Sequence, residues 1–421
     1  MGNGLQRTLY SLLFYILLPG IWLRLLWRSI REPLYRQNFL QRLGFVPRKN
    51  RLQPAVWVHA VSAGETIASA PLVEQLLTHK VSVVMTNMTA TGRDRVDALL
   101  GDRVDNYYAP YDVPGSVKRF IHRVQPKVLV IIDTELWPNT IHYCHHLGVK
   151  VVLVNARLSE KSFQGYRRIS GIAASMMGHI DFIASQTQAQ ADRFVEMGLD
   201  QNKLHVFGSI KFDISPPENL GSKADLLRAE LGSRPTFIAA STHRGEESLV
   251  LDVFIELRRQ FPDLLLIIAP RHTHRTPEIT KMIADVGLSF CLRSGPDRSR
   301  VDVFLLDTMG ELGYFYAASD VAFVGGSFSA IGGHNFLEAV VAQVPVVMGP
   351  HIASIEDIVA QFVDHEALCL VDDKAQFLSA LQQLLSDGEY RKAMVQRASD
   401  IRSRNAGALE STLGLVLSQL G

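Results

Sequence analysis

The chain has 421 residues, of which 47% are hydrophobic and 20% are charged, and its formal net charge at pH 7 is +1. This length exceeds what one hydrophobic core usually organises, so two domains are expected. The composition excludes bulk disorder, collagen-like repeats and a disulfide-rich scaffold. The near-neutral charge disfavours a nucleic-acid binder, and the three widely spaced cysteines have neither disulfide nor zinc-ligand spacing.

The N-terminal segment, residues 1–50, is both apolar and basic. Its run of uncharged, mostly apolar residues ends at Arg24 and is shorter than the ~20 residues that a perpendicular spanning helix needs. Trp22 and Trp27 beside arginines are typical of a membrane interface, and the excess of arginine predicts that the following domains are cytoplasmic. Up to residue 51, Glu32 is the one acidic residue, and the basic residues are Arg7, Arg24, Arg28, Arg31, Arg36, Arg42, Arg48, Lys49 and Arg51. We therefore predict a membrane anchor that either spans the bilayer at a tilt or lies in its interface.

Two other interpretations of this segment stay open. A cleaved signal peptide is disfavoured because no small-residue cleavage site follows and the basic residues come mainly after the apolar run. A buried helix of a soluble protein also fits a short apolar run. Attraction of the basic residues to anionic lipid, about 1 kcal/mol for each residue near the surface, favours the anchor.

Beyond residue 50, short apolar runs alternate with amphipathic stretches, a pattern typical of parallel sheets built from βαβ units. A polar stretch with two prolines, residues 213–222, marks a domain boundary. We predict two doubly wound, Rossmann-like α/β domains at residues 51–213 and 222–421. The predicted strands are 55–61, 81–86, 105–110, 127–133, 149–155 and 181–185 in the first domain, and 235–241, 264–270, 288–293, 301–307, 320–326, 344–349 and 367–371 in the second.

Ligands of open parallel sheets bind at the carboxyl ends of the strands, so the active site is expected in the cleft between the domains. Glu65 follows the strand at 55–61, at the predicted start of a helix, and is expected to point into that cleft. The alternative is a carboxylate that only complements the helix dipole, worth about 0.3–1 kcal/mol. His59, inside the strand, is expected to be a core residue rather than a catalyst.

A second acidic group follows the strand at 127–133, where Asp133, Glu135 and Trp137 precede Pro138, a residue suited to the first position of a helix. Two carboxylates at one cleft could divide the tasks of accepting a proton and fixing geometry. The alternative for Glu135 is a capping or salt-bridged surface acid.

Cationic groups also follow predicted strands. Lys211 lies near the domain boundary after Gly208 and Ser209, although a loop lysine is usually solvated. In the second domain Arg271 and His272 directly follow a strand, and the planar guanidinium suits phosphate oxygens. We therefore predict an anion site at Arg271.

A glycine-rich turn follows the strand at 320–326 and contains Gly325, Gly326, Gly332 and Gly333 before a helix. Backbone N–H groups there could approach a phosphate, helped by the helix dipole. The turn is neither a G-x-G-x-x-G nor a Walker loop, which disfavours dehydrogenases and P-loop enzymes. Asn335 and Glu338 lie one helical turn apart, so that Glu338 could hold a ribose diol, the alternative being a helix-surface glutamate.

These motifs together resemble a known family, the transferases of 3-deoxy-D-manno-octulosonic acid (Kdo) in lipopolysaccharide synthesis, which are metal-independent, inverting GT-B glycosyltransferases. The resemblance covers nearly the whole chain. It is carried by the basic N-terminal anchor followed, in order, by HAVSAGE, DTELWPN, GSIKFD, APRH, DTMGEL, GGSF and GGHNFLEA.

The resemblance implies transfer of Kdo from CMP-Kdo to the tetraacyldisaccharide precursor of lipid A (lipid IVA) by a protein anchored in the bacterial inner membrane, with its catalytic domains on the cytoplasmic face. It implies that Glu65 is the base that deprotonates the acceptor hydroxyl, and that Glu135 and Lys211 stabilise the transition state. The first domain would bind the acceptor and the second the donor. The implied CMP-binding residues are Pro270, Arg271, Met309, Gly310, Glu311, Ser327, Asn335, Phe336, Leu337 and Glu338, with Ser327 close to the phosphate.

The resemblance implies no cofactor and no catalytic metal, and we find no convincing Asp-x-Asp pair or histidine cluster for metal ligation. The expected partners are therefore CMP-Kdo, the lipid A precursor and membrane lipid, with no nucleic acid. Two alternatives remain, a membrane-associated GT-B transferase that uses a UDP-sugar and a non-catalytic nucleotide-binding protein.

Overall fold

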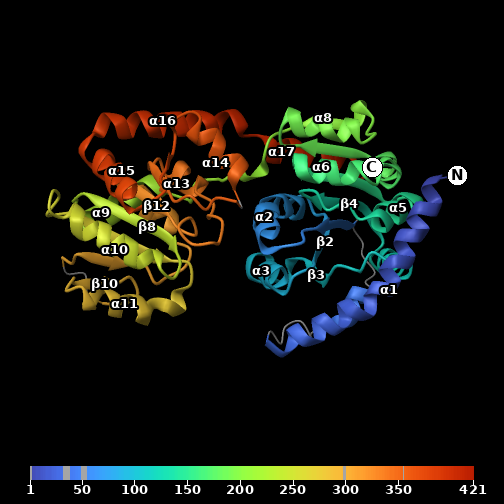
Figure 1. Ribbon diagram of the computed structural model, residues 1–421, viewed down its shortest axis with the longest axis horizontal. Helices are drawn as coiled ribbons and strands as arrows, with labels where there is room; N and C mark the ends of the chain where they lie inside the picture. The colour runs from blue at the N-terminus through green and yellow to red at the C-terminus, as the bar shows by residue number, and fades with distance from the viewer. Residues whose placement is uncertain (1, 32–37, 49–54, 297–299, 354) are drawn as a thin grey trace. The chain divides into compact units, whose positions relative to one another are not determined.

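Seven parallel strands form the sheet of the first of two units in a computed structural model (Figure 1), which describes residues 2–31, 38–48, 55–296, 300–353 and 355–421. The strand order is β3-β2-β1-β4-β5-β6-β7, so the chain changes direction across the sheet between β1 and β4. The strands are β1 (Ala55–His59), β2 (Ser82–Asn87), β3 (Asp105–Tyr108), β4 (Pro126–Ile132), β5 (Lys150–Ala156), β6 (Phe182–Ser185) and β7 (Leu204–Val206).

Helices cover both faces of this sheet. One face buries side chains from α2, α3 and α17, and the other buries side chains from α4 to α8. The helices of the unit are α1 (Gly2–Arg31), α2 (Ala63–Thr78), α3 (Ala90–Leu100), α4 (Pro114–Val124), α5 (Pro138–His146), α6 (Glu160–Arg167), α7 (Ser170–His179), α8 (Gln188–Glu196) and α17 (Ala408–Ser418), with short 3₁₀ helices η2 (Phe39–Leu43), η3 (Gly101–Arg103), η4 (Gln201–Lys203) and η5 (Ile210–Phe212).

The second unit, residues 214–404, is built in the same way. Its parallel sheet has the order β10-β11-β9-β8-β12-β13-β14 and changes direction between β8 and β12. The strands are β8 (Thr236–Thr242), β9 (Leu265–Pro270), β10 (Phe290–Leu292), β11 (Val303–Leu305), β12 (Val321–Val324), β13 (Val346–Met348) and β14 (Cys369–Leu370). The helices are α9 (Leu220–Glu230), α10 (Glu246–Leu257), η6 (Thr273–Arg275), α11 (Thr276–Asp285), α12 (Leu312–Ala317), α13 (Leu337–Val341), α14 (Glu356–Val363), α15 (Lys374–Ser386) and α16 (Gly388–Asn405).

Every strand predicted from the sequence is present, but β7 was not predicted. Its three residues are too few to display a period, and none of them is buried. The two predicted doubly wound sheets are therefore confirmed.

The C-terminal segment corrects the predicted second domain, which was expected to extend to residue 421. Residues 405–421 belong to the first unit, because α17 buries Ala408, Thr412 and Val416 there and packs against α2. The carboxylate of Asp213 accepts hydrogen bonds from the N–H groups of Gly407 (2.6 Å) and Leu409 (2.7 Å). It therefore supplies acceptors for N–H groups that have no partner within α17.

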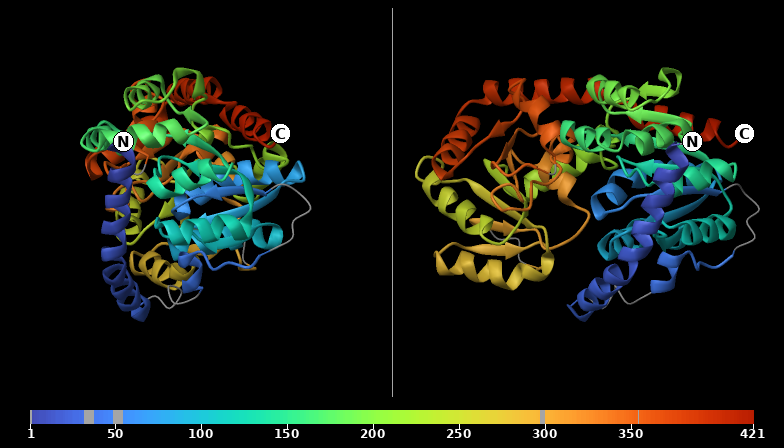
Figure 2. Two further views of the ribbon diagram at one scale, coloured as in Figure 1. Left: turned by 90° about the vertical axis from the view of Figure 1, so that its right-hand side faces the viewer. Right: turned by 45° about the vertical axis from the view of Figure 1, so that its right-hand side comes forward.

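Helix α1 is longer than the apolar run predicted from the sequence, because it continues through Arg24. Among the described residues, it is the one helix long and apolar enough to cross a membrane, over Gly4–Trp27. The helix lies along the flank of the first unit and contacts α5 and α7 (Figures 1 and 2). Glu32, Arg36, Lys49 and Arg51, part of the basic pattern noted above, lie outside the described residues.

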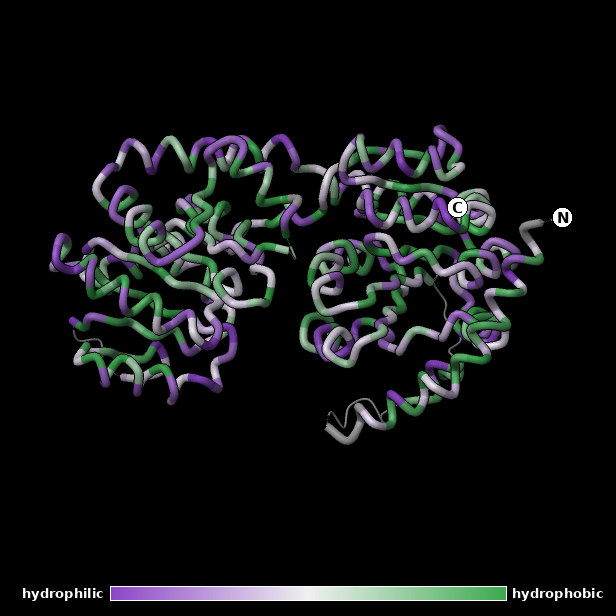
Figure 3. The backbone as a smooth tube through the Cα atoms, viewed as in Figure 1, coloured by the Kyte–Doolittle hydropathy of each residue, from purple (hydrophilic) through white to green (hydrophobic). Residues whose placement is uncertain are grey.

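The two sides of α1 differ in their surroundings. Its inner side places Phe14, Leu18 and Trp22 against the first unit, and the buried hydroxyl of Ser11 contacts the amide of Asn139 at 3.0–3.2 Å. Its outer side leaves large apolar side chains in solvent, and Figure 3 shows hydrophobic residues recurring along the helix. These exposed residues are Leu5, Leu9, Leu12, Leu13, Tyr15, Ile16, Leu17, Leu23, Leu26 and Trp27.

In the second unit a buried carboxylate holds the glycine-rich turn. Glu246, at the start of α10, is 2% exposed. One of its oxygens accepts from the N–H groups of Ser327 (3.0 Å) and Phe328 (2.9 Å), and the other from those of His243 (2.9 Å) and Gly326 (2.8 Å). A Cβ on Gly325 would lie 2.7 Å from this carboxylate, so only glycine fits there. The turn is therefore closed around a protein carboxylate.

We expect Glu246→Gln to lower the free energy of unfolding of the second unit by about 2–4 kcal/mol, because the new amide nitrogen cannot accept and leaves buried N–H groups unpaired. Circular dichroism follows urea unfolding of the whole chain, whereas fluorescence reports the first unit, which contains all four tryptophans. The control Glu256→Gln, on the same helix as Glu246, removes an exposed ion pair with Lys374 of α15 and should change the midpoint little. An unchanged dichroism midpoint for Glu246→Gln would contradict the assignment.

Candidate active site

Glu65 lies at the first turn of α2, directly after β1. The side chain of the N-cap residue Ser62 accepts from the N–H of Glu65, and the Glu65 carboxylate accepts from the Ser62 hydroxyl (2.8 Å) and from the N–H of Val61 (2.7 Å). This resembles a capping box, so Glu65 stabilises the start of α2, whereas the sequence suggested only a dipole role as the alternative to catalysis. Burial raises the pKa of Glu65, and hydrogen bonds from Ser62 and Val61 oppose that shift. A carboxylate offers about four lone-pair sites, so Glu65 keeps at least one for a ligand.

Glu135 follows β4, the strand next to β1, and therefore lies at the point where the sheet changes direction. Burial, together with the negative charge of Glu65, raises the pKa of Glu135 to about 7. The structure thus brings together the two acids that the sequence singled out. At neutral pH the pair is not fully ionised, because a second negative charge beside the first is unfavourable in a half-buried site.

A chain of polar contacts connects these loops to Lys211. The side-chain N–H of Asn155, at the end of β5, donates to Asp133 at 2.5 Å. The side-chain amide oxygen of Asn155 accepts from the hydroxyl of Ser209 (3.1 Å) and the N–H of Ile210 (3.2 Å). Ser209 begins η5, which carries Lys211 and contacts α2. Asn155 is 1% exposed, so it fixes the turn of Lys211 relative to the loop of Glu135.

His59 is a core residue, as expected. It is 4% exposed, and burial lowers its pKa to about 4. Its Nδ1 lies 2.9 Å from the Thr86 hydroxyl oxygen, which accepts from the indole N–H of Trp57 at 2.7 Å. Because that oxygen already accepts a hydrogen bond from Trp57, we assign the Thr86 hydroxyl as the donor to Nδ1 of His59.

In the second unit two histidines meet where the sheet changes direction. His243 follows β8 and His334 follows β12, and their Nε2 atoms lie 2.7 Å apart. Burial, followed by the charge of Arg271, lowers the pKa of His334 to about 4, and burial also lowers the pKa of His243. One imidazole must donate to the other, and both are held neutral beside cationic groups.

Arg271 directly follows β9, and its N–H donates to the carbonyl of Thr242 at 3.1 Å. Its charge acts on His243, His334 and His272, where burial is the main cause of a lowered pKa. A groove of about 540 Å³ lies beside this cluster and is lined by His243, Arg244, His272, His274, Arg275, Pro277 and Glu278. Glu247 and Glu278 pair with Arg275, and Glu278 also pairs with Arg244. Neutral imidazoles next to a guanidinium can donate hydrogen bonds to an anion and gain a proton when it binds.

The loop before α12 presents Met309, which is 70% exposed, and Gly310, whose φ is +84°. The carboxylate of Glu311 is already occupied, since it accepts from the Arg293 guanidinium at 2.8 Å and from the Thr308 hydroxyl at 2.5 Å. Glu311 therefore shapes this loop, and Met309 and Gly310 are its accessible part.

Several predicted CMP-binding side chains instead face the interior. Ser327 is fully buried, and its hydroxyl donates to the carbonyl of Val324 (2.7 Å) and accepts from the N–H of Gly349 (2.9 Å). With Glu246 occupying the amides of 326–328, the expected phosphate contact at this turn is not free. Phe336 and Leu337 are core residues, and Pro270 is buried at the end of β9. Glu338 is exposed, and Asn335, also exposed, accepts from the N–H of Leu337 at 3.1 Å.

Sequence reasoning missed four residues of this architecture, namely Asn155, His243, Glu246 and His334. His243 directly follows β8, His334 lies in the glycine-rich turn, Asn155 lies at the end of β5 and Glu246 begins the helix after β8, so proximity to a strand end is the signal that could have identified them. It also missed a group of three histidines, His142, His146 and His179, which the structure brings together outside this site and which corrects the expectation that the chain lacks a histidine cluster.

Comparison with known proteins agrees with this architecture. Residues 37–214 match the family model described as 3-deoxy-D-manno-octulosonic-acid transferase (kdotransferase), and residues 296–400 match glycosyl transferases group 1. The chain is 36% identical to the 3-deoxy-D-manno-octulosonic acid transferase of Haemophilus influenzae, over 97% of this chain and 98% of that protein. It is 33% identical to the enzyme of the same name from Bordetella pertussis, over 99% and 100%.

A solved structure of the glycotransferase of kitacinnamycin shares the fold, with a TM-score of 0.54 at 12% identity over 88% of this chain and 100% of that one. The chain matches two transferases over nearly their whole length, which establishes the family. Its two doubly wound units establish the fold. The chain belongs to the 3-deoxy-D-manno-octulosonic acid (Kdo) transferases and is a glycosyltransferase of the GT-B fold class.

Proposed function

We propose that this enzyme transfers Kdo from CMP-Kdo to a hydroxyl of the tetraacylated lipid A precursor, with inversion at the anomeric carbon and without a catalytic metal. The observation that carries the proposal is the coupled pair of Glu65 and Glu135, which follow adjacent strands where the sheet of the first unit changes direction. Ligands of open α/β sheets bind at such points.

The two acids differ in a way that suits the reaction. Glu65 accepts two hydrogen bonds that favour its ionised form, so it acts as the base that removes the proton of the acceptor hydroxyl. Glu135, with a pKa of about 7, keeps its proton near neutral pH and donates a hydrogen bond to charge that develops in the transition state. Lys211, on the turn fixed by Asn155, supplies a positive charge for the same purpose.

The donor is assigned to the second unit. CMP-Kdo carries a phosphate and a sugar carboxylate, and both suit the cluster of Arg271, His272, His243 and His334. Met309, Gly310 and Asn335 belong to accessible loops, and the exposed Glu338 lies in the first turn of α13; together they complete the proposed CMP site, with Glu338 on the ribose diol. The cationic cluster neutralises the leaving phosphate, and attack from the opposite face of the sugar inverts the anomeric centre in one displacement.

Helix α1 is proposed to lie in the interface of the bacterial inner membrane, with the rest of the chain on the cytoplasmic side. Its inner side is committed to the first unit through Ser11, Phe14 and Leu18, whereas its outer side is apolar and exposed. A helix that crossed the bilayer alone would need both sides free for lipid. An interfacial helix instead keeps the first unit beside an acceptor that stays in the membrane.

Replacing the base should abolish transfer. We expect Glu65→Gln to lower kcat about 100-fold or more, because the amide cannot accept a proton, while binding of CMP-Kdo is unchanged. Mass spectrometry counts Kdo added to lipid IVA in detergent with a chelator present, and calorimetry measures CMP-Kdo binding. Glu74→Gln, an exposed glutamate on the same helix, is the matched control. A thermal melt checks stability, which should change little because glutamine can also complete a capping box. Retention of most turnover would remove Glu65 from the base role.

The proton on Glu135 should be visible in the pH profile. The folded-state pKa is raised to about 7, so the group is protonated below that value and ionises as the pH rises through it. We expect kcat/KM of the wild-type enzyme to fall above about pH 7. Glu135→Gln keeps a permanent donor and should lack this alkaline limb. An identical fall in both proteins would show that another group is responsible.

Membrane binding should depend on the outer side of α1. We expect the double variant Leu12→Ser and Ile16→Ser to bind vesicles of phosphatidylethanolamine and phosphatidylglycerol roughly 100-fold more weakly. The reason is that two apolar side chains inserted into lipid contribute about 3 kcal/mol to membrane binding. Both side chains are exposed in the folded protein, so folding should be preserved. Leu226→Ser, on the exposed surface of α9, serves as the control. Unchanged binding of the double variant in vesicle sedimentation would contradict the interfacial role of α1.

A further inference from the structure

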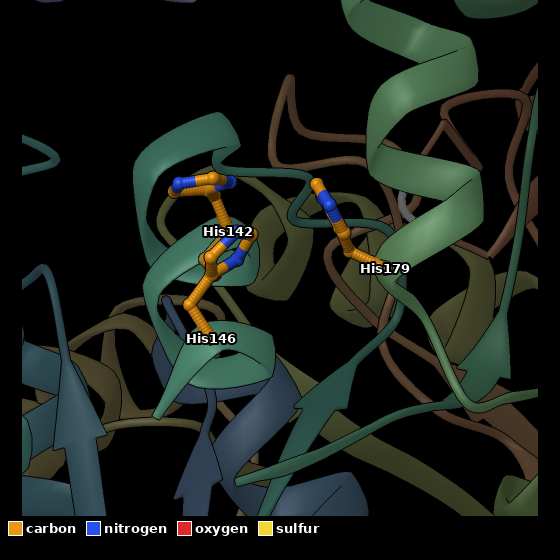
Figure 4. Close-up of side chains that lie close together, drawn as sticks. All are labelled: His142, His146 and His179. Atoms are coloured by element: carbon orange, nitrogen blue, oxygen red, sulfur yellow. The ribbon is translucent and has the colours of Figure 1, made fainter. Parts of the chain in front are cut away.

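Three histidines gather at the far end of α5 from Glu135. His142 and His146 are one turn apart on α5, and His179 is the last residue of α7 (Figure 4). One nitrogen from each ring lies within 4.8 Å of those of the other two. The centroids of the His142 and His146 rings are 3.8 Å apart, and that of His179 is 5.2 Å from that of His142. The proposed transfer reaction uses none of these side chains.

The hydrogen bonding of His146 prepares one of its nitrogens for a ligand. Its Nδ1 lies 2.9 Å from the backbone carbonyl oxygen of His142, which can only accept, so Nδ1 carries the proton. The neutral ring then has its free lone pair on Nε2. A carbonyl bound to the distal N–H is the arrangement that orients histidine ligands in metal proteins.

The spacing is close to that of a coordination site. A tetrahedral zinc ion with bonds of ~2.0–2.1 Å holds its ligand nitrogens roughly 3.4 Å apart. The three nitrogens therefore need to approach by no more than about 1.4 Å, which small side-chain rotations provide, and His146 is exposed enough to move.

The ligand atoms, rather than the positive charges around them, select the kind of ion. Arg7 lies beside His142 and His179, and the ammonium of Lys203 donates to the carbonyl of Ile180 at 2.9 Å. The nearby carboxylate of Asp181 is engaged by Lys150 at 2.9 Å. Hard cations that depend on carboxylate oxygens are disfavoured here, whereas imidazole suits zinc and its neighbours in the first transition series.

We propose that His142, His146 and His179 bind one Zn²⁺ ion, with water as the fourth ligand, and that this ion joins α5 to α7. Helix α1 contacts both of these helices, so the metal stabilises the surface on which α1 rests. The site is structural and separate from the transfer reaction.

The test uses the full chain in detergent after removal of metal with a chelator and subsequent removal of the chelator. Calorimetric titration with ZnCl₂ should show one ion per chain, and Co²⁺ should give the visible absorption of a tetrahedral site. Zn²⁺ at a hundredfold excess over its Kd should raise Tm by about 5 °C or more, since the ion binds only the folded first unit. His122→Gln, an exposed histidine on α4, is the control and should behave as wild type.

His179→Gln decides the proposal, because it removes the one ligand from α7 and leaves the pair on α5 intact. We expect it, like His146→Gln, to weaken Zn²⁺ binding at least tenfold and to lose the thermal shift. Wild-type affinity in His179→Gln would overturn the proposal and show only the weak binding of an i,i+4 histidine pair. Equal loss in His122→Gln, or no saturable binding by the wild-type chain, would also overturn it.

Discussion

Unpaired backbone N–H groups at the carboxyl ends of parallel strands are the constraint on which both units depend. Each strand ends where a helix begins, and the first N–H groups of a helix have no partner within it. In both units a glutamate after the first strand supplies the acceptor. Glu65 binds the N–H of Val61 and the hydroxyl of Ser62, whereas Glu246 binds the N–H of His243 and three N–H groups of residues 326–328, in the turn after a neighbouring strand. The same physical need thus produces one carboxylate that is fully used and one that keeps free lone pairs.

That difference separates structure from chemistry. Glu246 is enclosed by donors, so its charge is stabilised and its turn is rigid. Glu65 shares its surroundings with Glu135, and burial makes a second negative charge there unfavourable. A pair of acids that resists full ionisation destabilises the folded state, but it retains one proton that is available for the reaction. The second unit uses the corresponding position for two neutral histidines, His243 and His334.

The sequence was sufficient for features that depend on local pattern and order. Periodicity predicted both sheets, and the ordered motifs predicted the family and the pairing of Glu65 with Glu135. It failed where residues distant in sequence meet. The return of α17 to the first unit depends on Asp213 and on an apolar face that α2 and α3 leave open, and no local period reports that. Ser327 and Phe336 were assigned to a pocket because they lie in a motif, whereas the packing of that motif turns their side chains inward.

The three histidines illustrate the same limit and link the two ends of α5. The spacing of His142 and His146 was visible in the sequence, but His179 becomes their neighbour only because α7 packs against α5. The start of α5 is fixed by the buried carboxylate of Asp112, which accepts from the N–H groups of Asn139 and Thr140 immediately after the Glu135 loop. Its other end has no comparable set of charge-assisted bonds among the described residues. An ion bound there would fix the helix at both ends, and with it the contact between Asn139 and Ser11 that seats α1 on the first unit.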